Sequence, residues 1–262
     1  MKRGYIDTPH GQMHYGAAGT RGSYVFLLHT SPLTHAEYTG VVPILAERHR
    51  VVAFDNPGYG HSDPPPQPPT LADYARPIVA AIDSLTRDRI VLVGTHTGAG
   101  IAVETTTGAL RGRVSHLVLS GTPLFTPEER TYFRSRTVRP EAARDGSHLA
   151  HAWERQVERW GEDTGMATLN WGIACGLWAT DAARSPIFAC TEYDMAGALA
   201  RIDCPTLLLN GEGDPLLEND RRAAPLIPGA RLSVVPSRNG PSLPYAEPKV
   251  FADQILAFIG GR

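Results

Sequence analysis

Short apolar segments rich in β-branched residues alternate along the chain with longer segments whose apolar positions recur at helical spacing. The short segments predict strands over residues 25–29, 51–55, 90–94, 114–120, 206–210 and 232–235. The longer segments predict helices over residues 36–48, 71–85, 97–110, 216–224 and 246–259. Buried strands that alternate with helices are typical of a parallel sheet covered on both faces. The pattern therefore predicts an α/β protein.

Three local signals refine this prediction. Thr70 is a good N-cap for the helix that follows it, and Pro77 is expected to kink that helix. Residues 5–17 alternate between apolar and polar around His10 and Gly11, which indicates a hairpin. The proline-rich run over residues 63–70 is interpreted as a stiff connecting loop.

The strand pattern disappears between residues 122 and 201, where helical spacing takes over. We interpret residues 122–201 as a helical lid inserted into a core domain formed by residues 1–121 and 202–262. All four tryptophans lie in this insertion, at Trp153, Trp160, Trp171 and Trp178. Some belong to the interior of the lid, but the set also favours a pocket with aromatic walls, to which we assign Trp153 and Trp178.

Composition excludes several classes of protein. The 262 residues are 42% hydrophobic and 20% charged, which suits a packed globular domain. With 25 basic and 27 acidic residues, the chain lacks the positive excess of a nucleic-acid-binding protein. No apolar run is long enough to span a membrane, and the first residues lack the apolar core of a secretion signal. We therefore expect a cytoplasmic protein with no membrane or nucleic-acid partner, whose three cysteines are reduced thiols.

A tight turn follows the predicted strand at residues 90–94. It reads Gly94-Thr95-His96-Thr97-Gly98 and leads directly into a helix. Gly-x-Ser-x-Gly in this setting is the nucleophile elbow of α/β-hydrolases. Glycines flank such a turn because any Cβ there would collide with the strand or the helix.

Three further segments fall in the order expected of that superfamily. His29-Thr-Ser-Pro32 is similar to its oxyanion loop, residues 55–63 to its Asp-x-x-Gly-x-Gly-x-Ser-Asp turn, and residues 207–215 to the loop that bears the triad acid. Together these motifs resemble the α/β-hydrolase superfamily over almost the whole chain. The resemblance implies a mostly parallel eight-stranded sheet flanked by helices, with an inserted helical lid.

Two of the three triad positions depart from the family pattern. His96 occupies the nucleophile position, and Pro241 occupies the position of the catalytic histidine. The chain has ten histidines, but none follows His151, so no shifted loop can supply the missing base. Only the acid, Asp214, remains. The ordinary Ser-His-Asp mechanism is therefore excluded, because both its nucleophile and its base are absent.

His96 and Asp214 form the candidate catalytic pair. Histidine is longer than serine, so His96 can extend toward Asp214, which would fix its tautomer and raise the basicity of the other ring nitrogen. The resemblance assigns the oxyanion-hole amides to Thr97 and Ser31, and the Ser31 hydroxyl offers another donor. The competing interpretations are a decayed site for His96 and a loop cap for Asp214.

Other polar residues have weaker signals. Thr30, His35, Tyr38 and Pro241 are candidate substrate contacts, although His35 suits a helix start equally well. His29 is expected to order its loop, and His61 and Ser62 to serve their turn. His148 and His151 share a helix face, for which a solvated surface is favoured over a metal site.

Three functions fit these residues. The first is a cofactor-independent enzyme that hydrolyses an ester, lactone or C–C bond of a small apolar carbonyl compound, with His96 as general base or acid. The second is a lyase, isomerase or cyclase that uses the same pocket. The third is an inert ligand-binding protein. The sequence leaves the choice among them, the substrate and the oligomeric state open.

Overall fold

A computed structural model of the chain describes residues 1–66, 68–137, 142–179, 186–237 and 242–261. Eight strands form one sheet within these residues: β1 (Lys2–Thr8), β2 (Gly11–Ala18), β3 (Tyr24–Leu28), β4 (Arg50–Phe54), β5 (Ile90–Thr95), β6 (Val114–Ser120), β7 (Thr206–Gly211) and β8 (Arg231–Val235). The six strands predicted after the hairpin are confirmed, with ends that differ by at most one residue. Their apolar, β-branched runs are long enough for one buried strand each.

The order of strands in the sheet is β1-β2-β4-β3-β5-β6-β7-β8. β1 and β2 form the predicted hairpin, and β2 pairs antiparallel with β4. From β4 to β8 all neighbouring pairs are parallel. The carboxyl ends of β3, β5, β6 and β7 therefore meet at one edge of the sheet, where loops from distant parts of the sequence come together.

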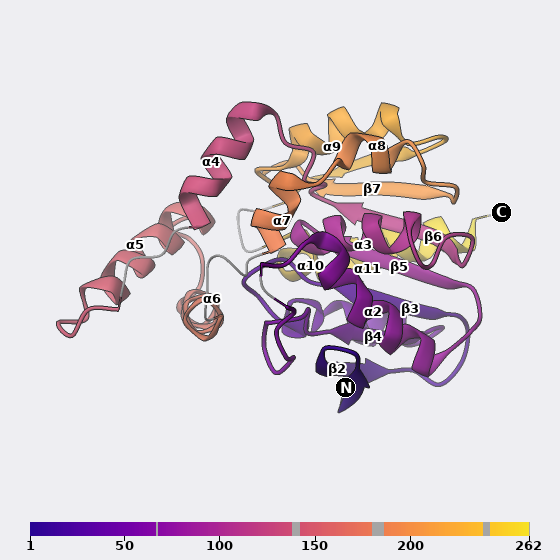
Figure 1. Cartoon of the computed structure of the whole chain (residues 1–262), viewed down its shortest axis with the longest axis horizontal. Helices are drawn as coiled ribbons and strands as arrows, with labels where there is room; N and C mark the ends of the chain where they lie inside the picture. The colour runs from indigo at the N-terminus through magenta and orange to yellow at the C-terminus, as the bar shows by residue number, and fades with distance from the viewer. Residues whose placement is uncertain (67, 138–141, 180–185, 238–241, 262) are drawn as a thin grey trace.

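Both faces of the sheet are buried under helices. Along β3, Phe26 and Leu28 belong to one apolar cluster, while Val25 and Leu27 belong to another on the opposite face. The helices α2 (Leu71–Leu85) and α3 (Thr97–Thr107) cover the first face, and α1 (Val41–Leu45) and α11 (Pro248–Gly260) cover the second. Figure 1 shows α2 and α3 in front of the sheet and α11 behind it. This two-sided burial explains why the central strands are apolar throughout.

The helices near the chain termini differ partly from the prediction. The helix predicted over residues 36–48 is two shorter elements, η1 (His35–Tyr38) and α1, separated at Gly40. A Cβ at Gly40 would lie 2.7 Å from the Pro248 ring, so α11 packs directly against this break. α2 has the predicted bounds and a capping box at Thr70, and it continues through Pro77. The short helix α10 (Leu243–Ala246) precedes α11.

Helices also fill the segment between β6 and β7. They are α4 (Pro127–Thr137), α5 (Ser147–Trp160), α6 (Met166–Trp178), α7 (Pro186–Glu192) and α8 (Met195–Leu199). α7 and α8 contact α3, whereas α4, α5 and α6 extend to one side of the sheet (Figure 1). After β7 the chain continues through α9 (Leu217–Ala223) and the 3-10 turn η3 (Ala224–Leu226) to β8.

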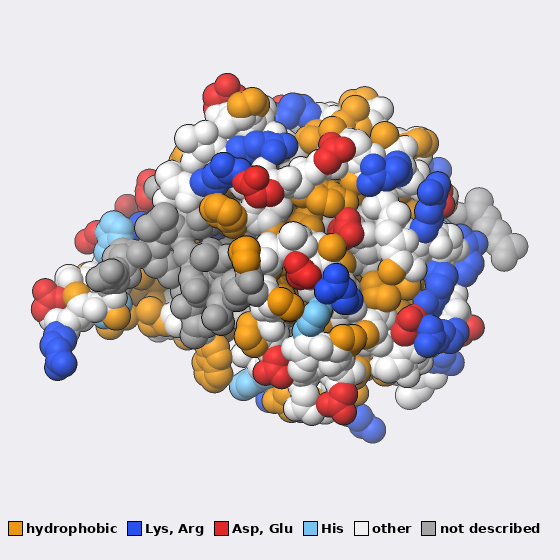
Figure 2. Space-filling model, viewed as in Figure 1, with side chains coloured by type: hydrophobic (Ala, Val, Ile, Leu, Met, Phe, Trp, Pro, Cys, Tyr) orange, Lys and Arg blue, Asp and Glu red, His pale blue; other side chains and the backbone are white. Residues whose placement is uncertain are grey.

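Acidic and basic side chains are interspersed on the face drawn in Figure 2, in keeping with the net charge of −2. Among the described helices, none combines the length and the apolar character that a bilayer span needs.

Tyr38 has no exposed surface that a substrate could contact, contrary to the prediction from the sequence. Its side chain is fully buried between the sheet and α11, beside Phe251. The hydroxyl donates to the Leu28 carbonyl at 2.9 Å and lies 2.8 Å from the Thr95 hydroxyl. The Tyr38 hydroxyl therefore joins η1 to the ends of β3 and β5.

Replacing Tyr38 with Phe should lower stability without changing the site. The variant loses the hydroxyl but keeps the ring, so we expect the free energy of unfolding to fall by about 1–2 kcal/mol. Urea unfolding measures the loss. A variant as stable as the wild type would show that these two hydrogen bonds contribute nothing.

Candidate active site

His96 sits on a strained turn between β5 and α3. Its backbone has φ 48° and ψ −110°, and among the described residues it is the only one other than glycine with a positive φ. A Cβ at Gly94 would lie 2.4 Å from the Gly98 carbonyl oxygen, and one at Gly98 would lie 2.2 Å from the Leu28 carbonyl oxygen. Only glycine fits at either position, so the turn lifts the His96 side chain out of the sheet.

The imidazole of His96 extends sideways over the end of β6 toward the end of β7. A Cβ built on Gly121 would meet His96 Cδ2 at 2.2 Å, so the absence of a side chain at Gly121 leaves room for the ring. Nε2 of His96 lies 2.8 Å from Oδ2 of Asp214, and both side chains are less than a tenth exposed. The second carboxylate oxygen of Asp214 accepts the Leu216 amide at 2.8 Å.

The two groups shift each other's protonation. Burial lowers the pKa of His96, but the negative charge and hydrogen bond of Asp214 outweigh burial and raise that pKa above its usual value. Burial raises the pKa of Asp214, but the charge of His96 and its hydrogen bond outweigh it and lower the net pKa. The pair therefore favours an imidazolium facing a carboxylate, and Nε2 keeps its proton toward Asp214 when the ring is neutral.

Behind this pair lies a second buried carboxylate, Asp220. It accepts the Gly121 amide at 2.8 Å, the Thr122 amide at 2.7 Å and the Asn210 side chain at 2.9 Å. Burial raises the pKa of Asp220, and its hydrogen bonds only partly oppose this effect. Asp220 thus fixes the turn at Gly121 on which the His96 ring rests.

The loop after β3 is ordered by His29, as expected. Nδ1 of His29 donates to the Thr30 carbonyl and Nε2 accepts the Asn56 amide, each at 2.8 Å. Burial lowers the pKa of His29 to about 4, so its ring is neutral near neutral pH. The Thr30 amide donates to Glu37 at 2.8 Å, so the backbone of Thr30 is already engaged.

The two predicted oxyanion-hole donors differ in availability. The Ser31 amide donates to the Thr97 hydroxyl at 2.8 Å, and that hydroxyl donates to Ser31 Oγ at 3.0 Å. The Ser31 amide, which the resemblance assigns to the oxyanion hole, is therefore not available to a substrate oxygen in this structure, because the threonine hydroxyl accepts its hydrogen bond. The Thr97 amide begins α3 and has no partner within the helix. It is the donor that remains for a substrate oxygen.

Glu37 is a site residue that the sequence analysis missed. This side chain is 1% exposed and lies close enough to His96 and Asp214 for each charge to shift its pKa. Burial dominates and raises the pKa of Glu37 to about 7. The available signal was its position four residues before Val41, which puts it on the apolar side of the predicted helix.

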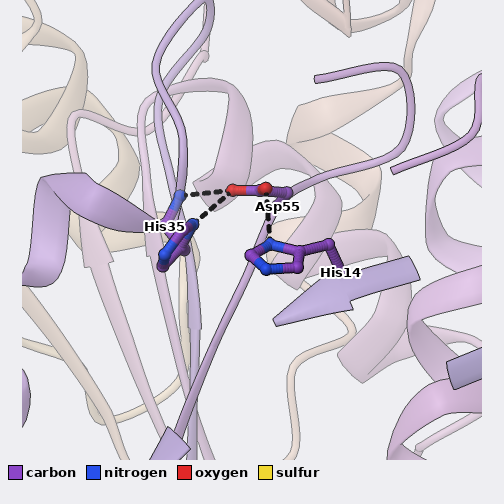
Figure 3. A group of neighbouring side chains, drawn as sticks. All are labelled: His14, His35 and Asp55. Atoms are coloured by element: carbon purple, nitrogen blue, oxygen red, sulfur yellow. Dashed lines mark hydrogen bonds and ion pairs between the residues drawn. The ribbon is translucent and has the colours of Figure 1, made fainter. Parts of the chain in front are cut away.

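Asp55 is the centre of a second polar cluster, drawn in Figure 3 with His14 and His35 on either side. One carboxylate oxygen lies 2.8 Å from Nδ1 of His14, and the other accepts the His35 amide at 2.7 Å and lies 2.8 Å from Nδ1 of His35. The His61 amide also donates to Asp55, at 3.1 Å. These atoms are close enough to surround a metal ion, but both carboxylate oxygens are already saturated by donors.

The cluster therefore has a structural role, joining β2, the turn after β4 and the start of η1. His35 is the first residue of η1, which confirms the helix-start interpretation, and its ring faces Asp55. Ser62 completes the junction, since it accepts the His14 amide at 2.9 Å and donates to the Asp55 carbonyl at 2.7 Å. His61 and Ser62 thus serve their turn, as predicted.

The remaining predicted residues lie on or near the inserted helices. Trp153 packs with Trp160 in a small cluster that includes Leu33 of the loop after β3. Trp178 is 62% exposed and contacts the edge of the His61 ring, so it is a surface residue and not a pocket wall. Pro241 lies outside the described residues. His148 accepts the Ala143 amide at 3.1 Å.

Comparison with known proteins shows the family to which the chain belongs. The chain matches the model of the alpha/beta hydrolase family over residues 25–254 and therefore belongs to that family. The eight-stranded, mostly parallel sheet and the flanking helices are those that the resemblance implied, so the predicted fold class is confirmed.

Individual relatives are distant. The non-heme haloperoxidase of Rhodococcus erythropolis is 27% identical over 258 residues, covering 91% of this chain and 92% of that protein. A match at 35% identity to mycobacterial proteins extends over 102 residues, and the chain spans only 17% of their length.

Two solved structures share the fold. A hydrolase from Pseudomonas aeruginosa superposes with TM-score 0.83 at 23% identity, over 99% of this chain and 98% of that one. The enol-lactonase from Burkholderia xenovorans superposes with TM-score 0.79 at 19% identity, over 98% and 100%.

The protonation of His96 provides a test of the geometry. In Asp214→Asn the charge that raises the pKa of His96 is lost while burial, which lowers it, remains, so the pKa should fall below that of the wild type. NMR titration of the ring resonances measures the shift, with Asp203→Asn on the surface as the control. An unchanged pKa would mean that the two side chains are not paired in solution.

Proposed function

We propose that this protein hydrolyses small esters or lactones by a water molecule that His96 activates, with Asp214 holding the imidazole. The observation that carries the proposal is the hydrogen bond of 2.8 Å between His96 Nε2 and Asp214 Oδ2, formed at the family's nucleophile elbow. Because Nε2 is engaged with Asp214, Nδ1 is the ring nitrogen left to act as the base.

The proposed reaction needs no covalent intermediate. Nδ1 of neutral His96 accepts a proton from water while the water oxygen bonds to the carbonyl carbon of the substrate. The carbonyl oxygen becomes an oxyanion, for which the Thr97 amide at the start of α3 is the available donor. The oxyanion then reforms the carbonyl and expels the leaving oxygen, which takes up a proton to give the alcohol.

The substrate class draws support from the family and from two proteins that share the fold, the hydrolase from Pseudomonas aeruginosa and the enol-lactonase from Burkholderia xenovorans. The pKa shifts of His96 and Asp214 also favour His96 as a general base. Asp214 raises the pKa of His96, which strengthens the base, and stays ionised itself to balance the imidazolium formed during the reaction.

His96→Ala should remove the activity while leaving the fold intact. With p-nitrophenyl butyrate as the probe, we expect the rate to fall by about 10²- to 10⁴-fold, the usual contribution of a general base. His151→Ala, an exposed histidine on α5, is the matched control and should keep wild-type activity. Equal rates in His96→Ala and the wild type would exclude His96 as the base.

Phosphonates that attack activated serines separate this mechanism from a serine enzyme. Because the elbow carries histidine, we expect no loss of activity and no covalent adduct in the intact mass of the protein. A serine adduct that accompanies inhibition would contradict the proposal. An acyl group found on His96 during turnover would replace base catalysis with nucleophilic attack by the ring.

A wild-type protein that binds a carbonyl ligand, shows a raised melting temperature and returns the ligand unchanged would instead be an inert receptor. Release of a product with unchanged mass would indicate an isomerase or cyclase. Both results would overturn hydrolysis.

A further inference from the structure

Glu37 is a buried acid for which the scaffold offers incomplete hydrogen bonding. It lies in η1, and its Oε2 atom accepts the Thr30 amide at 2.8 Å. Its other oxygen, Oε1, is buried and makes no hydrogen bond within 3.5 Å among the described residues. A buried carboxylate without partners is costly, whereas a neutral carboxylic acid in the same place keeps one O–H group to donate.

The position of Glu37 links it to the catalytic pair. The Thr30 amide that orients it belongs to the predicted oxyanion loop, one residue before Ser31. Ser242, which follows the family's histidine position along the chain, is also buried. A hydrogen bond from its hydroxyl lowers the pKa of the Glu37 carboxyl, so the two side chains are neighbours, although no hydrogen bond within 3.5 Å joins them. Glu37 therefore lies beside the residue that directly follows the family's histidine position in the sequence.

Titratable groups from several elements lie near Glu37. His96 at the start of α3 lowers the pKa of Glu37, while Asp214 after β7 raises it. Tyr38 is adjacent in η1, and Cys175 on α6 lies near enough for the charge of Glu37 to raise the pKa of its thiol. Burial outweighs these interactions, so Glu37 is largely protonated below a pKa of about 7.

We propose that Glu37 is the general acid of the site, donating a proton from Oε1 to the leaving oxygen in place of the histidine that the family carries after its last strand. This proposal rests on the proposed hydrolysis. When the bond between carbonyl carbon and leaving oxygen breaks, the oxygen takes the proton of Glu37 and departs as the alcohol. The proton that His96 took from water then returns to the Glu37 carboxylate through solvent, which restores both groups.

The dependence on the leaving group tests this role directly. A p-nitrophenolate leaves without protonation, whereas an alkoxide needs a proton. In Glu37→Gln, which keeps an oxygen to accept the Thr30 amide, hydrolysis of ethyl butyrate should fall by about 10²-fold or more. Hydrolysis of p-nitrophenyl butyrate should stay within about 3-fold of the wild type, because the loss of a general acid affects only the step that requires it. Equal losses on both esters would reduce Glu37 to a structural residue.

Two controls separate folding from chemistry. Glu47→Gln removes an exposed carboxylate just after α1 and should leave both rates unchanged. Stability supplies the second control. Because the pKa of Glu37 is raised from 4.5 to about 7, the carboxyl favours folding below about pH 4.5 and progressively loses this contribution as pH rises to about 7. The melting temperature should therefore fall less in Glu37→Gln than in the wild type over that range.

Infrared difference spectra between wild type and Glu37→Gln give a readout that needs no turnover. The carbonyl band of a neutral carboxylic acid should be present at about pH 6 and disappear with a midpoint near 7. The midpoint should rise in His96→Ala, which removes the charge that lowers it, and fall in Asp214→Asn.

The two readouts distinguish the possible failures. If the wild type hydrolyses neither ester but shows the carbonyl band, Glu37 is protonated but the proposed hydrolysis is wrong. The acid role of Glu37 in that reaction is then overturned as well. A Glu37 that is ionised at about pH 6 would overturn the present inference alone.

Discussion

The hydrogen bond between His96 and Asp214 is the interaction on which the organisation of the site depends. It joins the strained turn after β5 to the loop after β7, and it crosses the end of β6 to do so. This hydrogen bond requires a tight turn at His96 and space for the imidazole ring, and glycines provide both. Gly94 and Gly98 allow the turn, and Gly121 leaves space for the ring. Asp220 holds Gly121 in place by accepting its amide. A histidine at the elbow can thus reach Asp214. In the family, the acid at this position pairs instead with a histidine from another loop.

Burial gives this arrangement its chemistry. His96, Asp214 and Glu37 are all largely excluded from water, so their charges act on one another with little screening. The ion pair raises the pKa of the imidazole, while the incompletely paired Glu37 keeps a proton up to about pH 7. A base and an acid with different environments in one buried site are what general acid–base hydrolysis needs. The proposal of such a mechanism follows from this contrast and not from a conserved triad.

The sequence predicted the strands and turns that surround the site better than the side chains that lie in it. The apolar runs and the glycines around His96 predicted the strands and the elbow, because those features depend on local backbone geometry. The position of Asp214 after β7 was enough to place it near His96. Tyr38 and Trp178 were assigned wrongly, since burial of one and exposure of the other depend on how distant segments pack. Glu37 was missed for the same reason: its position placed it on the apolar side of a predicted helix, but that position does not predict its contact with the Thr30 amide in the loop after β3.

The most direct test of the account compares two titrations of the wild-type protein. One is the pH dependence of kcat/KM for p-nitrophenyl butyrate, and the other is the NMR titration of the His96 ring. If neutral His96 is the base, the acidic limb of the kinetic profile must have the same midpoint as the loss of the imidazolium proton, which lies above the usual value for histidine. Activity that is unchanged while His96 loses its proton would contradict the central claim.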